Sequence, residues 1–176
     1  MRVKNMMVIA GSAVLLTGCA SVYEEAADTV ASAQIRDRSG AVVGNANFYS
    51  LAGEMTVSAT FSGLAAGIHA VHLHTAGDCS ANDFTSAGGH LNPGGNEHGT
   101  RNPRGAHLGD LPNVTIAADG SGSVSALLRG RSADVIGHLF DSDGTAIVVH
   151  GGADDYVTDP AGAAGSRVAC GVVTRS

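Results

Sequence analysis

Histidines dominate the chemistry that this sequence can offer. Six of its eight histidines, and one aspartate that follows one of them closely, form a set that runs from residue 72 to residue 150. These groups are His72, His74, His90, His98, His107, Asp110 and His150. Neutral imidazole is the commonest protein ligand for zinc and copper. One four-coordinate metal cannot use all of these groups, whereas two metals that share a ligand can. The set therefore predicts a binuclear metal centre.

The spacing within this set adds geometry. His72 and His74 are two apart in an expected strand over residues 68–74, so both side chains should point to one face. His69 has the opposite parity, and we expect it to be structural or to support a ligand. His107 and Asp110 are three apart at the end of a loop, which suits a turn around one metal. Taken alone, the spacing of His72 and His74 also fits an exposed polar strand face.

Short β segments separated by turn signals must position these groups. We expect eight strands, at residues 33–37, 42–49, 55–61, 68–74, 114–117, 124–128, 146–149 and 167–174. No stretch after residue 31 shows sustained helical periodicity, so the domain is predicted to be all-β, a sandwich or closed barrel. Two long segments, 75–112 and 151–166, interrupt the pattern. Loops of such length are usually functional or disordered, and the first carries four of the candidate ligands.

The first residues have the features of an export signal. Arg2 and Lys4 precede an apolar run over residues 6–16, which is too short to span a membrane. The run ends in a lipobox-like segment at Cys19, so we expect a lipoprotein signal peptide (1–18), a lipidated tether (19–31) and one domain (32–176). An ordinary secretory signal is the alternative. The expected location is the bacterial cell envelope, lipid-anchored and facing the periplasm; Ala20 favours the outer over the inner membrane.

The remaining cysteines and the charge agree with export. With Cys19 lipidated, Cys79 and Cys170 are left as a pair, and an oxidising compartment favours a disulfide over two buried thiols. Such a bond would stabilise the fold by about 4–5 kcal/mol. The net charge of −6 becomes −8 once Arg2 and Lys4 are removed, and no lysine remains. Such a chain is a poor nucleic-acid binder and attracts anions little.

Six separated segments resemble the copper–zinc superoxide dismutases. They lie, in the family's order, at residues 67–78, 86–93, 98–99, 107–111, 148–150 and 165–171. The resemblance covers roughly residues 33–174, and the Gly-Asp-Cys at 77–79 is similar to the bacterial branch. It implies an eight-stranded Greek-key β-barrel or sandwich, immunoglobulin-like, with two long functional loops.

The resemblance also implies a role for each group, with one copper and one zinc per subunit. Copper would be held by His72, His74, His90 and His150. Zinc would be held by His90, His98, His107 and Asp110, with His90 as the shared imidazolate. Asp154 would orient His72 and His98, Arg167 would hold the anionic substrate beside copper, and Cys79 and Cys170 match the family disulfide.

The implied reaction is the dismutation of superoxide to O₂ and H₂O₂, which needs a metal that cycles by one electron, as copper does and zinc does not. In that scheme His90 releases copper, accepts a proton and returns it. Zinc serves as a structural and electrostatic partner.

One departure from the family concerns steering of the substrate. The loop after His150 carries no lysine, so steering is expected to be weak or to rely on arginines such as Arg101, Arg104, Arg129 or Arg131. His138 has no assigned counterpart and is expected in a loop. A metal-binding module without turnover, and a structural lipoprotein, are the competing functions. The sequence leaves open a monomer or a homodimer, and the source of the superoxide.

Overall fold

Strands are the main regular structure in the computed structural model, which describes residues 27–176. Cys19, the expected signal peptide and most of the expected tether lie outside the described residues. The elements, in order, are β1 (Asp28–Asp37), β2 (Val42–Leu51), β3 (Glu54–Phe61), β4 (Gly67–His69), β5 (Val71–His74), the 3-10 helix η1 (Thr85–Ala87), β6 (Val114–Ile116), β7 (Gly122–Leu128), α1 (Ser132–Leu139), β8 (Ala146–His150), β9 (Arg167–Val172) and β10 (Thr174–Arg175). Within residues 27–176, no helix is long and apolar enough to cross a membrane.

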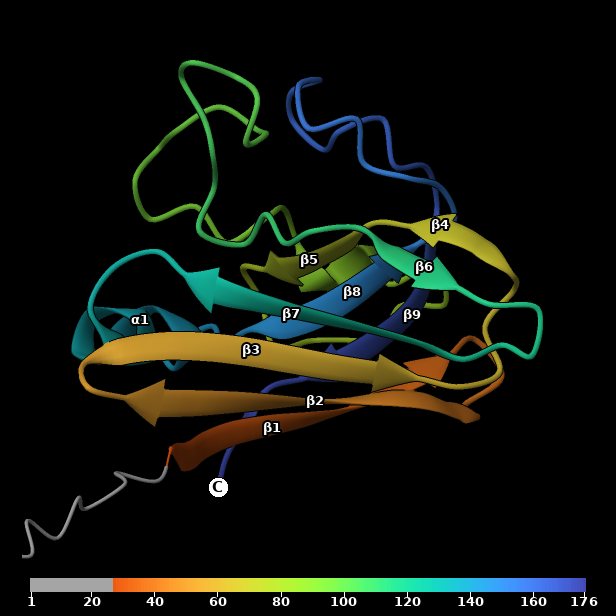
Figure 1. Ribbon diagram of the computed structural model, residues 1–176, viewed down its shortest axis with the longest axis horizontal. Coiled ribbons are helices and arrows are strands. Elements are labelled where there is room, and N and C mark those ends of the chain that lie inside the picture. Colours follow the sequence, from red (N-terminus) through yellow and green to blue (C-terminus); the bar gives the residue numbers. More distant parts are fainter. Residues whose placement is uncertain (1–26) are drawn as a thin grey trace, which may run out of the picture.

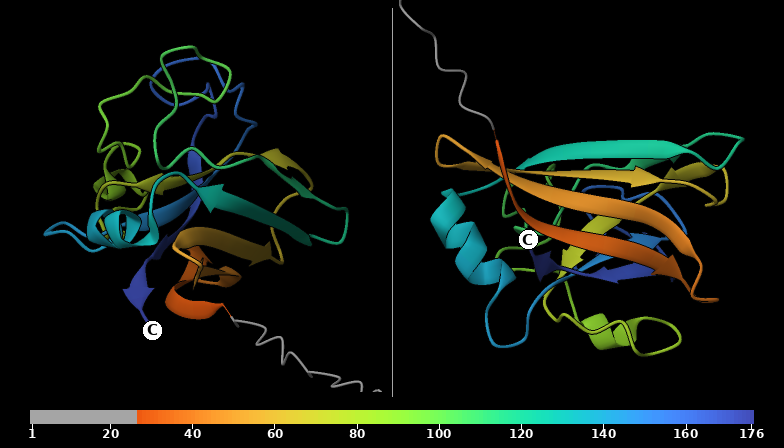
Figure 2. Two further views of the ribbon diagram at one scale, coloured as in Figure 1. Left: turned by 60° about the vertical axis from the view of Figure 1, so that its left-hand side comes forward. Right: turned by 90° about the horizontal axis from the view of Figure 1, so that it is seen from below.

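The strands form a curled antiparallel sheet, seen edge-on in Figure 1 and from two further sides in Figure 2. Its order is β5-β8-β9-β1-β2-β3-β7, while β10 pairs with β1 and β4 pairs with β6. Crossovers therefore bring β9 beside β1 and β7 beside β3, which confirms the all-β Greek-key prediction. The two long loops rise together from the same side of the sheet (Figures 1 and 2).

The strands differ from those expected most clearly at three places. Residues 68–74 are divided into β4 and β5 at Ala70, because β4 pairs with β6 whereas β5 pairs with β8. At the change of partner, the Ala70 N–H donates to Gly152 and its carbonyl accepts from His150. Residues 167–174 are divided into β9 and β10. Strand β1 begins at Asp28, paired with Ser50, so residues 28–31 belong to the sheet rather than to the tether.

The alternation of side chains explains why the strands form where they do. In β3, Met55, Val57, Ala59 and Phe61 are buried in the main core, while the residues between them are more exposed. Strands β5 and β8 are buried at every position. Their second face is covered by the long loops, so polar histidines on that face are buried as well.

One helix was not expected from the sequence. Although no stretch after residue 31 shows sustained helical periodicity, Ser132–Leu139 forms the short helix α1. Val135 and Leu139, four residues apart, are buried in the main core. The Ser132 hydroxyl donates to the carbonyl of Glu54 at 2.6 Å and fastens the helix to the β2–β3 hairpin. His138 therefore lies on this helix, half-buried, and not in a loop.

Candidate metal centre

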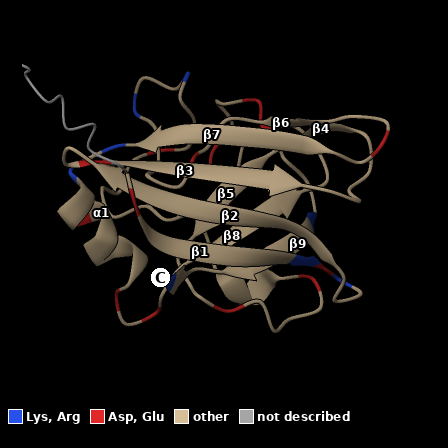
Figure 3. Ribbon diagram, turned by 60° about the horizontal axis from the view of Figure 1, so that its bottom comes forward, with Lys and Arg blue, Asp and Glu red and all other residues tan. Residues whose placement is uncertain are grey.

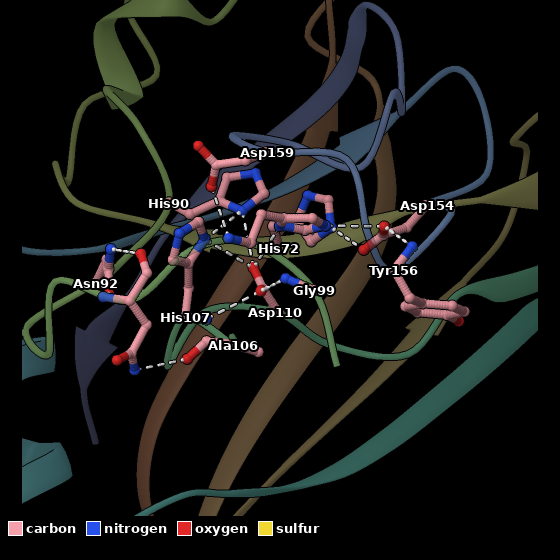
Figure 4. Close-up of polar contacts among 12 residues, drawn as sticks. His72, His90, Asn92, Gly99, Ala106, His107, Asp110, Asp154, Tyr156 and Asp159 are labelled. Atoms are coloured by element: carbon pink, nitrogen blue, oxygen red, sulfur yellow. Dashed lines mark hydrogen bonds and ion pairs between the residues drawn. The ribbon is translucent and has the colours of Figure 1, made fainter. Parts of the chain in front are cut away.

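Two strands and two loops bring the candidate ligands together. His72 and His74 project from β5 and His150 ends β8, all from the face opposite the main core. The loop over residues 75–113 runs alongside β5, since Leu73 donates to the carbonyl of Gly109 and accepts from the N–H of Leu91. This backbone pairing places His90 and the ligands that follow it over the strand histidines (Figure 4).

The first group of side chains could hold one metal ion. It consists of His72, His74, His90 and His150, all buried, whose ligand atoms lie within 4.8 Å of one another. In each imidazole the nitrogen that faces the group has no hydrogen-bond partner. Buried polar atoms without a partner are rare and costly, so four such nitrogens that converge on one point form a site suited to a cation. The donor set fits copper, which favours imidazole.

Hydrogen bonds on the outer nitrogens fix which nitrogen carries the lone pair. His74 Nδ1 donates to the carbonyl of Gly88 at 3.0 Å, and His150 Nδ1 donates to that of Gly165 at 3.2 Å. Their Nε2 atoms are thus unprotonated in the neutral rings. In His72 the roles are reversed, because Nε2 faces the carboxylate of Asp154 at 3.0 Å and leaves Nδ1 free. Such outer contacts orient ligands and fix their tautomers.

The second group contains His90 again, now through its other nitrogen. It consists of His90, His98, His107 and Asp110. Asp110 Oδ1 lies 2.9 Å from His90 Nδ1, 3.0 Å from His98 Nδ1 and 3.1 Å from His107 Nδ1. Tetrahedral zinc with bonds of about 2.0–2.1 Å would separate its ligands by about 3.3 Å. The 3.0 Å approach of His98 is too poorly aligned for a hydrogen bond, as expected for two ligands of a common ion.

Asp154 connects the two groups through the histidine nitrogens that point away from them. This buried carboxylate accepts from His72 Nε2 at 3.0 Å and from His98 Nε2 at 2.9 Å. It therefore orients one histidine of each group, as the resemblance implied. Gly162 packs against it with a φ of +64°, and a Cβ at that position would overlap the carboxylate. Glycine is required there both for the backbone conformation and for the space.

Burial keeps the histidines in the form that binds metal. It lowers the pKa of His74 to about 2, that of His150 to about 3 and that of His90 to about 4. For Asp110, burial alone would raise the pKa, but the contacts with His90 and the Gly99 N–H outweigh it and leave the pKa lowered. Neutral imidazoles and an ionised carboxylate are the ligand forms that a cation needs.

Arg167 stands at the opening of the first group. Its Nη1 and Nη2 donate to the carbonyls of Phe84 and Gly88, each at 2.6 Å. Arg167 lines a cavity of about 280 Å³ together with His74, Gly89, His90, Asn92, His107, His150, Pro160 and Ala161. Among these lining residues it is the one permanent cation, although burial lowers its pKa.

The four arginines considered for steering do not line this cavity. Arg104 pairs with Glu97, and Arg101 lies over the ring of Tyr156, 5.2 Å from its centroid. Arg129 donates to the carbonyl of Ala106 at 3.4 Å, and Arg131 precedes α1. Arg129 lines a separate cavity with His107 and Asp110 of the second group, and Arg167 is the cation that lines the cavity at the first group.

Supporting residues outside the expected set also hold the site. Asn113 accepts from the N–H of Asp154 at 2.8 Å and donates to its carbonyl at 2.9 Å. The carboxylate of Asp159 accepts from the N–H of His98 at 2.7 Å. A lone Asn or Asp in a loop carries no signal that would have identified either. His69 faces the carbonyl of His150 at 2.7 Å, so it lies behind a candidate ligand.

A disulfide fastens the first loop to the sheet. Cys79 and Cys170 are bonded across 91 residues, which confirms the expected pair. Cys170 lies on β9 and packs with Phe84, Ala87, Ala146 and Val148. The bond therefore anchors the segment whose carbonyls hold Arg167.

Comparisons with known proteins agree with this geometry. The sequence model described as copper/zinc superoxide dismutase matches residues 42–173. A Cu-Zn superoxide dismutase of Aquifex aeolicus is 37% identical over 173 residues, which span 94% of this chain and 96% of the relative. One from Caulobacter vibrioides is 46% identical over 115 residues, 63% of this chain and 66% of the relative. A crystal structure of a SOD-like protein from Bacillus subtilis superposes with a TM-score of 0.74 at 34% identity, covering 84% of this chain and 99% of that one.

Proposed function

The chain belongs to the copper/zinc superoxide dismutase family, and we propose that it catalyses the dismutation of superoxide at the site built around His90. Two superoxide anions and two protons give one O₂ and one H₂O₂. The observation that carries the proposal is the set of unpartnered nitrogens of His72, His74, His90 and His150, which converge beside Arg167.

The donor atoms fit both metals of the family. We assign copper to His72, His74, His90 and His150, and zinc to His90, His98, His107 and Asp110. Copper supplies the one-electron couple that dismutation needs, because superoxide is oxidised in one half-reaction and reduced in the other. Zinc keeps one oxidation state and so serves structure and electrostatics.

The chain's own residues bind the substrate and handle protons. Arg167 holds the anion in the cavity by charge and hydrogen bonding, since a guanidinium stays protonated. His90 carries a proton at Nε2 in one half of the cycle and delivers it to the reduced product. Asp154 keeps the rings of His72 and His98 fixed through this exchange, because it accepts from both.

A superoxide-decay assay on protein loaded with copper and zinc tests this function. We expect His150→Ala to remove at least about 99% of the activity. His138→Ala is the matched control, because this half-buried histidine lies on α1, outside both metal groups, and it should keep nearly full activity. A fully metallated wild-type protein without activity would favour the metal-binding module instead.

The location remains a second part of the proposal. We place the mature protein at the bacterial cell envelope, anchored through lipid on Cys19 and facing the periplasm, where it would remove superoxide outside the cytoplasm. The support is the apolar run over residues 6–16 followed by Cys19. In the host cell, Cys19→Ser should move the protein from the membrane to the soluble fraction; unchanged membrane association would contradict the anchor. Sedimentation of a lipid-free form would distinguish a monomer from a homodimer.

A further inference from the structure

A second cavity, apart from the metal groups, opens onto the disulfide. Its volume is about 540 Å³, and it lies between β1, the start of the first loop and β9. Its lining residues are Gln34, Arg36, Asp37, Arg38, Gly40, Cys79, Ser80, Ala81, Asn82, Phe84, Cys170, Val172 and Thr174. None of these also lines the cavity at Arg167. Both cysteines of the disulfide are therefore reachable from a space that plays no part in the proposed reaction.

The charges around this cavity favour an anionic guest. Arg36 and Arg38 are exposed, and Figure 3 shows basic residues at this end of β1 and in the turn after it. Arg36 donates to the carbonyl of Gly40 at 2.8 Å, and Arg38 to that of Arg167 at 2.6 Å. These acceptors are neutral, so they hold the guanidinium groups in place without cancelling their charge. Neither arginine forms an ion pair within residues 27–176.

The acidic side chains nearby already accept hydrogen bonds from their own turns. Asp37, which lines the cavity, accepts from the Ser39 N–H at 2.8 Å, the Ser39 hydroxyl at 2.7 Å and the Ala41 N–H at 3.0 Å. Asp83 accepts hydrogen bonds from the N–H and the hydroxyl of Thr85 and does not line the cavity. The positive charge of Arg38 is one of the causes that lower the pKa of Asp83. The lining thus carries two cations and one anion, although the chain as a whole is acidic.

The two sulfur atoms differ in access. Cys170 has only 2% of its surface exposed, whereas Cys79 is half-buried. Exchange with a disulfide begins when a thiolate attacks an accessible sulfur. Attack should therefore fall on Cys79 Sγ, with Cys170 Sγ as the leaving atom.

We propose that this cavity is a docking site for small anionic thiols, which open the Cys79–Cys170 bond by exchange. The guest's carboxylate rests between Arg36 and Arg38, and its thiolate attacks Cys79 Sγ. The S–S bond breaks, and its electron pair leaves on Cys170 Sγ, which takes up a proton. A second thiolate attacks the guest's sulfur in the mixed disulfide; it releases the Cys79 thiolate, which is protonated, and the oxidised guest disulfide. Two thiols are oxidised and the protein disulfide is reduced.

Opening the bond has a consequence at the metal site. Phe84 lines this cavity, and its carbonyl is one of the two that hold the Arg167 guanidinium; Arg38 donates to the Arg167 backbone. Reduction removes the covalent anchor of the segment around Phe84. The guanidinium of Arg167 is then less firmly placed, and under the proposed function the rate of superoxide decay falls.

Two thiols of opposite charge test the proposal on metal-loaded full-length mature protein. The disulfide is reduced by mercaptoacetate or by cysteamine at equal thiolate concentration, and the released cysteines are counted by alkylation and mass. Each rate is divided by the rate of the same thiol with the neutral bis(2-hydroxyethyl) disulfide, which removes the difference in intrinsic nucleophilicity. We expect the anionic thiol to react about three- to tenfold faster, because two cations lie beside the sulfur. The overall negative charge of the chain would by itself give the opposite order. A faster reaction with cysteamine would overturn the proposal, whatever the protein's activity.

Arginine variants test whether Arg36 and Arg38 cause the preference for the anionic thiol. R36Q/R38Q should lose the preference for mercaptoacetate, while R129Q/R131Q, with the same change of net charge away from this cavity, should keep it. If the ratio of the mercaptoacetate rate to the cysteamine rate is the same in the two variants, the docking site is refuted. If R36Q/R38Q fails to fold, the wild-type ratio in 1 M salt decides: screening over about 3 Å should reduce the preference to near one, and an unchanged ratio contradicts the proposal.

Discussion

The sheet and the two long loops are held together by different forces. Strands β1, β2, β3 and β7 pair in continuous ladders and bury alternate apolar side chains in one core. The loops over residues 75–113 and 151–166 contribute few residues to that core. They are held by metal-binding side chains, by Asp154 and by a disulfide. The sheet should therefore be ordered without metal, whereas the order of the loops should depend on it.

Removal of both metals should separate the two regions most strongly. Binding of metal to a preformed site contributes of the order of 10 kcal/mol, and here that free energy is linked to the loops. In chelated protein we expect the amides of Leu91 and Gly109 to exchange hydrogen at least about a thousandfold faster. Those of Phe48 and Val57 should change less than about threefold. Equal acceleration in both regions would show that the sheet also depends on metal; zinc alone should restore part of the protection.

A glycine-to-alanine change tests the same contrast in single residues. Gly162→Ala places a methyl group against Asp154, so we expect metal retention to fall about 10- to 100-fold, as for loss of a supporting contact. Gly137→Ala in α1 meets no atom within 4 Å and should instead stabilise the fold by up to about 1 kcal/mol. Competition with a chelator measures the first effect and urea unfolding the second. Unaltered metal retention in Gly162→Ala would remove Asp154 from its assigned role.

Acid should destabilise the metal-free protein through buried histidines of the first metal group. The folded pKa values of His74, His90 and His150 lie near 2 to 4, below the ordinary value of 6.5. Below pH 6.5 the unfolded chain therefore binds protons that the folded chain does not, and stability falls. Between pH 7 and pH 6 we expect a loss of about 2 kcal/mol for the three groups. Urea midpoints at the two pH values measure it, and a midpoint that is constant or rises on acidification contradicts the burial argument.

Salt should have the smallest effect. Arg167 is the one permanent cation lining the metal cavity, and the chain is acidic overall, so attraction of superoxide is weak. We expect the rate of superoxide decay to fall less than about twofold between 10 and 200 mM salt. A steep fall would mean that other arginines steer the substrate. A rise would mean that the acidic surface repels it.

The same division explains what could be predicted from the sequence. The strands were identifiable because burial on one face leaves a period of two, as in β3, and His72 and His74 were correctly assigned to one face by that rule. The separated ligands, and Asp154 four residues after His150, were identifiable through the resemblance, because nothing local joins residues 90 and 150. Their spatial convergence is confirmed, while their assignment to copper and zinc stays a proposal.

The misses have local physical causes. Helix α1 spans only eight residues and buries two apolar residues four apart, too few for a visible period. The break at Ala70 arises because its partners lie at residues 150 and 152, far away in the sequence. Asn113 was missed because its role depends on the backbone of Asp154, on another loop.

Strand β8 belongs to both regions. Ile147 and Val149 fill the main core, whereas Ala146 and Val148 pack beside the disulfide and His150 faces the metal groups. A change of side-chain volume on one face therefore shifts a ligand on the other. For anyone who redesigns this scaffold, the turn between β6 and β7 (117–121), which carries no candidate ligand, offers freedom in length and charge. The five residues of β8 offer almost none, since here folding and catalysis constrain the same backbone.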